Sequence, residues 1–291
     1  MKSMKTTKQI GVLSVAVLNF LAVSWTHADT IKQPVEPASR LRGFTVDQMS
    51  TGTLYKAATV WKANGVRYMM RPWYRAGGRS PSESWKRMLD ALPAQLDEAK
   101  RLNMTVVLAL FEIPNEHQRT YPSDGKWNEH FWDDASNSNV LAQCWRDVAT
   151  LCKDRDQEIW FDLLNEPLDW RDLYKTAYPK NWPLWAQGAI DAIRQIDTRH
   201  LVVVEAGPGS LSWGVRKLQP LKGGGIIYST HFYQPQSYTH QGISDLRSTD
   251  LQHAYLQRQR PYPGNFDQDG GNWDKGRLRQ EIQCLIDFQR R

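Results

Sequence analysis

The stretch IWFDLLNEP, residues 159–167, is a nearly continuous apolar run that ends in an Asn-Glu-Pro turn. Such runs are typical of strands that are buried on both faces, as in parallel sheets. Because proline cannot donate a hydrogen bond to a sheet ladder, Pro167 marks the end of the strand. We therefore predict a buried strand at residues 158–164 that carries Asn165 and Glu166 to the edge of a sheet.

Short apolar runs alternate with helical patterns on both sides of this stretch, which indicates parallel strand pairing. The predicted strands, in chain order, are residues 43–46, 66–70, 104–111, 158–164, 201–204 and 226–230. The predicted helices are residues 54–64, 85–102, 140–153, 183–196 and 275–289. Long loops follow the third, fourth and sixth strands, at the face that carries the active site in an α/β barrel.

This order of elements predicts an α/β fold of the (β/α)8 TIM-barrel type that is incomplete, with about six strand–helix units. A doubly wound open sheet is the alternative fold, although the glycine-rich turn that usually follows its first strand is absent from this sequence. Six strands leave open edges at the first and last strand, around an apolar interior. In the last helix we expect four apolar residues to face inward: Leu278, Ile282, Leu285 and Ile286.

A single barrel domain is expected at residues 29–291, because a chain of 291 residues is normal for one α/β barrel and no linker or repeat interrupts it. Residues 1–28 have the pattern of a signal peptide. Three lysines precede an apolar run at residues 10–25, and Ala28 is a small residue suited to cleavage. We therefore expect a secreted or periplasmic protein without stable membrane insertion after cleavage. An uncleaved membrane anchor is the alternative.

The net charge and the cysteine positions argue against nucleic-acid binding, a disulfide between Cys144 and Cys152, and a metal site. The formal net charge is +6, and three of the lysines would leave with residues 1–28, so nucleic acid is not an expected partner. Cys144 and Cys152 lie on one predicted helix, about 12 Å apart along its axis, which is too far for a disulfide. We predict buried thiols there. The spacing of cysteine and histidine indicates no metal site, and no cofactor is expected.

A glutamate at the rim of a barrel can donate a proton to a substrate bond, and Asn165 beside it could hydrogen-bond a sugar hydroxyl. The simpler interpretation is that Asn-Glu-Pro only forms a turn at a strand end. The chain also holds 13 Trp and 11 Tyr, whose faces suit stacking on sugars, although core packing will use many of them. Three tryptophans in predicted loops could be stacking platforms or plain packing: Trp73, Trp170 and Trp213.

The Asn-Glu-Pro turn and several other motifs resemble glycoside hydrolase family 5. The matching stretches are Phe131-Trp132, Trp145, Asn165-Glu166-Pro167, residues 229–233, residues 238–242, Pro263-Gly264 and residues 273–275, with Arg71 after the second strand. The similarity covers roughly residues 40–291. The Asn-Glu-Pro and His-x-Tyr motifs are specific in combination, and each is weak alone.

The resemblance implies roles for residues at strand ends. Glu166 resembles the general acid/base of the family, and Asn165 resembles the group that holds the sugar 2-hydroxyl. His231 and Tyr233 resemble the pair that orients the nucleophile and the substrate. Arg71 resembles the cation that keeps the nucleophile ionised.

Three of these residues also have a simpler explanation. His231 could be a hydrogen-bonded histidine at the rim, and Tyr233 could pack within its loop. Arg71 could pair with a nearby acid such as Glu112 or Asp162.

Members of the family retain anomeric configuration, which requires a second carboxylate about 5–5.5 Å from the acid/base. In the family this nucleophilic glutamate follows the seventh strand. The acids after His231 follow no apolar strand here: Asp245, Asp250, Asp267, Asp269, Asp274, Glu281 and Asp287. We therefore expect the nucleophile, and strands seven and eight, to be missing from this chain. Glu112 and Glu205, at the ends of the third and fifth strands, are expected to be substrate contacts or structural partners.

The implied function is hydrolysis of β-glycosidic bonds in cellulose or a related β-glucan or mannan, as in an endo-β-1,4-glucanase. Its partner would be a polysaccharide or oligosaccharide. Such an O-glycosyl hydrolase needs both carboxylates, so turnover depends on the missing nucleophile. The alternatives are a catalytically inactive glycan-binding remnant and a non-functional gene fragment.

Overall fold

Six parallel strands form the central sheet, hydrogen-bonded to one another in chain order. They are β1 (Gly43–Val46), β2 (Gly65–Met70), β3 (Thr105–Leu110), β4 (Ile159–Asp162), β5 (Leu201–Glu205) and β6 (Ile226–Ser229). The computed structural model describes residues 40–74, 77–118, 120, 130–169, 171, 178–240 and 261–291. The six predicted strands are confirmed in place and order.

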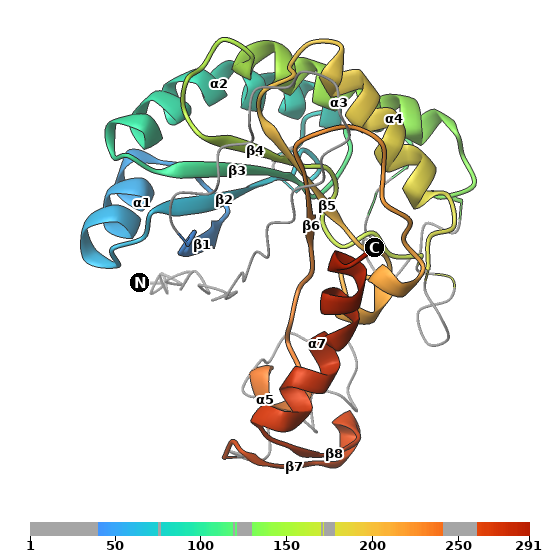
Figure 1. The fold of residues 1–291 in the computed structure, drawn as a ribbon. Coiled ribbons are helices and arrows are strands. Elements are labelled where there is room, and N and C mark those ends of the chain that lie inside the picture. Colours follow the sequence, from blue (N-terminus) through green and yellow to red (C-terminus); the bar gives the residue numbers. More distant parts are fainter. Residues whose placement is uncertain are drawn as a thin grey trace, which may run out of the picture.

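Helices cover one face of this sheet, as Figure 1 shows for α2, α3 and α4. The first crossover is α1 (Thr51–Tyr55), which continues directly into a π-helix, η1 (Lys56–Val60). The later crossovers are α2 (Pro81–Arg101), α3 (Ser136–Cys152) and α4 (Trp182–Arg194). Each predicted crossover helix is present, with its ends moved by a few residues.

The α2 helix begins one turn before its predicted start because of a capping box. The Ser80 hydroxyl accepts from the Glu83 amide at 3.2 Å, and the Glu83 carboxylate accepts from the Ser80 amide at 3.0 Å. Pro81 occupies the first helical position, where its missing N–H costs nothing. Polar capping residues carry no hydrophobic periodicity, so a prediction based on periodicity begins too late.

Side chains of each strand alternate between the two faces of the sheet. The face under the helices carries the main core, which includes Leu108 of β3 and Phe161 of β4. The opposite, inner face carries a second cluster with one buried residue from each of β3 to β6: Val107, Trp160, Val203 and Ile227. Burial on both faces explains why the strands read as nearly continuous apolar runs.

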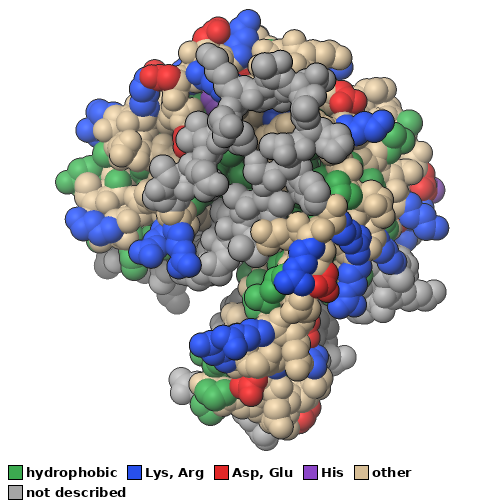
Figure 2. Space-filling model, viewed as in Figure 1, with side chains coloured by type: hydrophobic (Ala, Val, Ile, Leu, Met, Phe, Trp, Pro, Cys, Tyr) green, Lys and Arg blue, Asp and Glu red, His purple; other side chains and the backbone are tan. Residues whose placement is uncertain are grey.

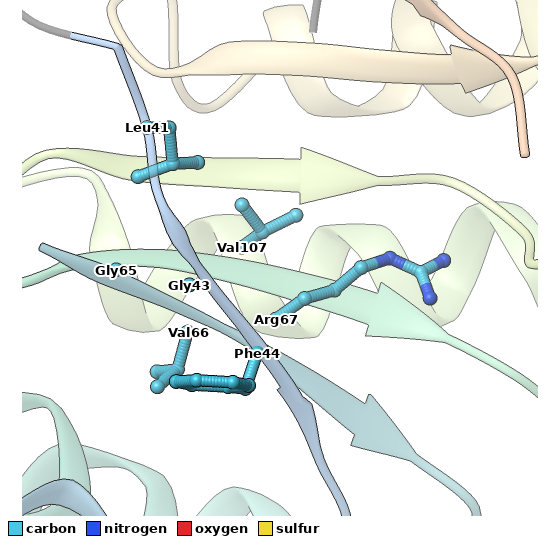
Figure 3. Close-up of a pocket in the computed structure, with 7 residues that line it drawn as sticks. All are labelled: Leu41, Gly43, Phe44, Gly65, Val66, Arg67 and Val107. Carbon is cyan, nitrogen blue, oxygen red and sulfur yellow. The ribbon is translucent and has the colours of Figure 1, made fainter. Parts of the chain in front are cut away.

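A small hollow at the inner face is lined mainly by β1, β2 and β3 (Figure 3). Gly43 and Gly65 are register partners there, and a Cβ on Gly43 would stand 2.0 Å from the Gly65 carbonyl oxygen. The missing side chain lets β1 approach β2 closely. Arg67 lines the same hollow, and its guanidinium points away from the glycines, along the direction of the strands (Figure 3). β2 therefore carries a cation toward the carboxyl ends of the strands.

After β6 the chain forms a short helix, an antiparallel hairpin and a final helix. These are α5 (Gln236–Thr239), β7 (Gly264–Phe266), β8 (Gly271–Trp273) and α7 (Lys275–Gln289), with the short helix η4 (Asp267–Asp269) between the hairpin strands. Figure 1 shows α5 and the hairpin together at the end of α7 that lies away from the sheet.

The bounds of the last predicted helix are confirmed, but its most deeply buried residues differ from those predicted. Cys284 and Phe288 are buried, whereas the four residues expected to face inward are only partly buried. The reason is that the C-terminal half of α7 packs on η3 (Ser212–Arg216), where Cys284 Sγ lies 3.2 Å from the Ser212 carbonyl oxygen. Leu285 packs against the same contact, as predicted, but it is only partly buried.

All three cysteines are free and buried, which confirms the thiols predicted at Cys144 and Cys152. Burial raises the pKa of Cys152 to about 12. Among the described residues, no helix combines the length and the apolar character needed to cross a membrane. Residues 1–28, the predicted signal peptide, lie outside the described part of the chain.

Candidate active site

Glu166 lies at the carboxyl edge of the sheet, just past β4. The preceding residue, Asn165, donates its amide proton to the Leu110 carbonyl at the end of β3, at 2.8 Å. Glu166 then adopts a φ of 46°, in the left-handed region that non-glycine residues rarely occupy. Its amide donates to Glu205 Oε2 at 2.7 Å. The Glu166 side chain is 34% exposed, so its carboxylate can meet a molecule from solvent.

His231 follows β6 and bridges two carboxylates. Its Nδ1 lies 2.7 Å from Glu166 Oε1, and its Nε2 lies 3.1 Å from Glu205 Oε1. The His231 amide donates to the Ser210 carbonyl at 2.8 Å, which ties the loop after β6 to the loop after β5. With both ring nitrogens facing carboxylate oxygens, the imidazole is suited to be a doubly protonated cation.

Arg67 of β2 is buried beneath these residues and joins three strands. Its Nε donates to Asp162 Oδ2 at 2.7 Å. One terminal nitrogen donates to Glu205 Oε1 at 2.7 Å and to Asn165 Oδ1 at 3.1 Å. We call Arg67, Asp162, Glu205, His231 and Glu166 the charge network.

Mutual attraction within the charge network shifts its protonation equilibria. Burial lowers the pKa of His231, but the Glu205 charge and the hydrogen bond to Glu166 outweigh it and raise the pKa to about 10. Burial likewise opposes the ionised form of Glu205, yet His231 and Arg67 hold its pKa below the usual range. Burial raises the pKa of Asp162, and the Arg67 charge only partly offsets this. At neutral pH the network therefore contains a charged His231 and an ionised Glu205.

Tyr233 adjoins the network through its ring. The rings of Tyr233 and His231 meet edge-on with centroids 6.2 Å apart, and the ring of His240 lies 5.3 Å away on another side. Burial, followed by the charge of Glu166, raises the pKa of Tyr233. The structure thus brings Tyr233, His231, Asn165 and Glu166 to one edge of the sheet, while their individual roles remain predictions.

Arg71 lies outside these contacts. Its guanidinium stands over the Tyr74 ring at 4.5 Å, and one of its nitrogens lies 3.7 Å from Asp47 Oδ1. The expected alternative partner Asp162 is instead bound by Arg67. Arg67 is not among the residues that the sequence motifs predicted. The signal that could have found it is a charged residue in the middle of an apolar strand, where burial requires a partner.

The remaining residues that the sequence predicted are three tryptophans, Glu112 and Glu205. Trp213 is a partly buried residue of η3, beneath α7, and Trp73 is partly buried in the turn after β2. Trp170 lies outside the described residues. Glu112 is buried and accepts from the Tyr74 amide at 3.2 Å. The structural-partner interpretation of Glu205 agrees with its complete burial.

Parallel strands with crossover helices on one face, and ionisable side chains gathered at the carboxyl edge, define a barrel-type α/β protein with its polar site at the usual end. Within that class, the chain belongs to glycosyl hydrolase family 5. The family model described as Cellulase (glycosyl hydrolase family 5) matches residues 29–276. This match confirms the resemblance that the motifs indicated.

Endoglucanase 3 of Fibrobacter succinogenes is 32% identical to this chain over 149 residues. The matched region is 50% of this chain and 20% of that protein, so the chain spans about a fifth of that relative.

Solved structures show the same fold. A glycoside hydrolase structure superposes with a TM-score of 0.62 at 19% identity, over 95% of this chain and 76% of that one. The endoglucanase Cel5A of Thermotoga maritima gives a TM-score of 0.61 at 19% identity, over 83% of this chain and 68% of Cel5A. These neighbours and the six parallel strands confirm a TIM-barrel-type fold that is partial.

Proposed function

We propose that this chain acts in the hydrolysis of β-glycosidic bonds of a polysaccharide, with Glu166 as the general acid/base. The observation that carries the proposal is the placement of Glu166. A partly exposed carboxylate stands at the carboxyl edge of the sheet, held through its amide by Glu205 and through Oε1 by His231. A fixed carboxyl group that reaches solvent can protonate a leaving oxygen and later activate water.

The relatives support a β-linked glycan as the substrate class. The F. succinogenes relative is an endoglucanase, and structures of T. maritima Cel5A have been solved with cellobiose and with mannotriose. We therefore propose cellulose or a related β-glucan or mannan as the substrate. The partly exposed ring of Tyr233 and the partly buried Trp213 are candidates for contact with sugar rings.

A retaining two-carboxylate mechanism is part of the proposal, and it needs a nucleophile about 5–5.5 Å from Glu166. Glu205 and Asp162 are poor candidates because both are buried and paired with Arg67. Attack on a sugar carbon would turn either carboxylate into a neutral ester and leave the buried Arg67 without that anion. We propose that the nucleophile is a carboxylate other than the members of the charge network.

The test compares Glu166→Ala with the parent protein on two aryl β-glycosides that differ only in their leaving group. Loss of the acid should lower kcat/KM for the poor leaving group about 10³-fold and spare most of the first step for the activated one, which leaves without a proton. Glu98→Ala, which removes a surface glutamate of α2, is the control and should match the parent. The configuration of the first-formed sugar, followed by NMR, reports retention.

Two outcomes would count against this proposal. An equal loss on both substrates would remove Glu166 from the acid/base role. A parent protein that binds an insoluble β-glycan but releases no sugar or aryl alcohol would replace hydrolysis with the glycan-binding alternative.

We also propose that the protein is exported to the periplasm or the medium, with residues 1–28 removed. The basic start, the apolar run and the small residue Ala28 support this proposal.

A further inference from the structure

Glu205 is a completely buried carboxylate at the end of β5, and three different groups meet its two oxygens. Oε1 accepts from Arg67 at 2.7 Å and lies 3.1 Å from His231 Nε2. Oε2 accepts the Glu166 amide proton at 2.7 Å. A buried carboxylate is costly unless it is paired and hydrogen-bonded, and Glu205 meets both conditions with groups that surround Glu166.

We propose that Glu205 is a positioning residue that holds Glu166 in place from two sides, through its backbone and through His231. The inference rests on the proposed acid/base role of Glu166 and adds the residue that sets its geometry and its charged neighbour.

The backbone contact is the first line of support. Glu166 has a φ of 46°, a conformation that costs energy for a residue with a side chain. The hydrogen bond from its amide to Glu205 Oε2 compensates that cost only in this conformation. Without the acceptor, the Glu166 amide loses this hydrogen bond, and the cost of the left-handed conformation is no longer offset. The Glu166 carboxylate would then move relative to a bound sugar.

The side-chain contact is the second line of support. His231 faces Glu166 from the end of β4 and Glu205 from β5, with Arg67 of β2 and Asp162 of β4 behind them and the Tyr233 ring at its edge. Glu205 separates the Arg67 guanidinium from the imidazolium, because its Oε1 contacts both. Neutralising Glu205 would leave two cations without their shared anion, so His231 would release its proton more easily.

The protonated imidazolium contributes stability in a defined pH range. Its pKa is raised from 6.5 to about 10, so the contribution is complete below about pH 6.5 and is lost as the pH rises toward 10. In the folded protein His231 stays mostly protonated at any pH below about 10, so Glu166 keeps a cationic hydrogen-bond donor there.

The test is Glu205→Gln, with Asp197→Asn as the matched control. Asp197 is also a buried carboxylate beside a histidine, with Oδ2 2.5 Å from His200 Nδ1, but it lies before β5 and outside the charge network. NMR titration of the His231 ring should give a midpoint near 10 in the parent and in the control. In Glu205→Gln the midpoint should fall toward the ordinary value near 6.5.

Kinetics on the same pair of aryl glycosides form the second readout. Glu205→Gln should lower kcat/KM about 10²-fold for the poor leaving group and about 10-fold or less for the activated one. Asp197→Asn should leave the ratio between the two substrates unchanged. A loss of folding alone would lower both rates equally.

Glu205→Asp keeps the proposal testable if the glutamine variant does not fold. Aspartate retains the charge, so His231 should stay protonated. Its side chain is one methylene shorter, so the hydrogen bond to the Glu166 amide should weaken. The ratio of kcat/KM for the activated substrate to kcat/KM for the poor leaving group should therefore rise. A His231 midpoint near 10 in Glu205→Gln, or an unchanged ratio in the variant that folds, would overturn the positioning role. A parent protein without turnover would instead count against the proposed function, and the His231 titration would still decide the role of Glu205.

Discussion

Arg67 is a buried cation shared by two buried carboxylates, and its side chain is only 3% exposed. Arg71, four residues further along the chain, is 29% exposed, and its ion pair with Asp47 spans 3.7 Å. The two arginines therefore differ in what they contribute. Removal of a buried cation leaves its carboxylate partners buried and unpaired, whereas a partly exposed ion pair is screened by solvent and contributes little.

We predict that Arg67→Met lowers the free energy of unfolding by about 3–5 kcal/mol, because Asp162 and Glu205 would be left buried without their cation. Arg71→Met should cost at most about 1 kcal/mol. Chemical denaturation of both variants at neutral pH gives the comparison. Equal costs would mean that Arg67 is less important to the buried charges than its contacts indicate. Restored stability of Arg67→Met at low pH, where the carboxylates are neutral, would support the electrostatic cause.

At the scale of single elements, α2 is defined by its ends as well as by its apolar stripe. Ser80 and Glu83 satisfy each other's backbone amides at the first turn. The helix holds Trp85, whose indole nitrogen donates to Asp147 of α3 at 3.1 Å, so its first turns fix a contact between neighbouring helices.

We predict that Ser80→Ala destabilises the protein by about 1 kcal/mol, since the Glu83 amide loses its acceptor. Ser138→Ala in α3 is the control, because the Ser138 hydroxyl donates to the Ala135 carbonyl at 2.7 Å and does not accept a helix amide. Its cost should stay within about 0.5 kcal/mol. Thermal unfolding of the two variants separates these values, and matching midpoints would show that the capping box adds little to α2.

At the scale of the whole molecule, the sheet assembles a site that no single segment contains. Arg67 comes from β2, Asp162 from β4, Glu205 from β5 and His231 from the loop after β6. In the described part of the chain, β1 and β6 each pair on one side only. On the face that Figure 2 shows, lysine and arginine side chains lie both on the body that holds the sheet and on the region around α7.

The proposed export concerns the whole chain and predicts a defined new N-terminus. Protein recovered from the periplasm or the medium should begin at Asp29, because Ala28 is the small residue at the end of the apolar run. N-terminal sequencing of the recovered protein measures this directly. Protein that keeps Met1 and stays with the membrane fraction would instead favour the uncleaved anchor.

The sequence by itself was sufficient to predict the six strands, the crossover helices and the rim position of Glu166, because hydrophobic periodicity and strand-ending residues are local signals. It was also sufficient to indicate the family, through Asn-Glu-Pro and His-x-Tyr at the ends of two strands. It did not locate the start of α2 or the most deeply buried residues of α7. The first depends on polar caps, and the second depends on which neighbour a helix happens to contact.

Only the tertiary structure decided which arginine joins the charge network and what surrounds Glu166. Arg67 lies within β2 and pairs with Asp162 and Glu205, whereas Arg71 follows the last residue of β2 and pairs with Asp47. Glu205 is far from Glu166 in the sequence and becomes its backbone partner only because β4 and β5 are neighbours in the sheet. Electrostatic pairing acts through space over a few ångströms, so residue order alone does not encode it.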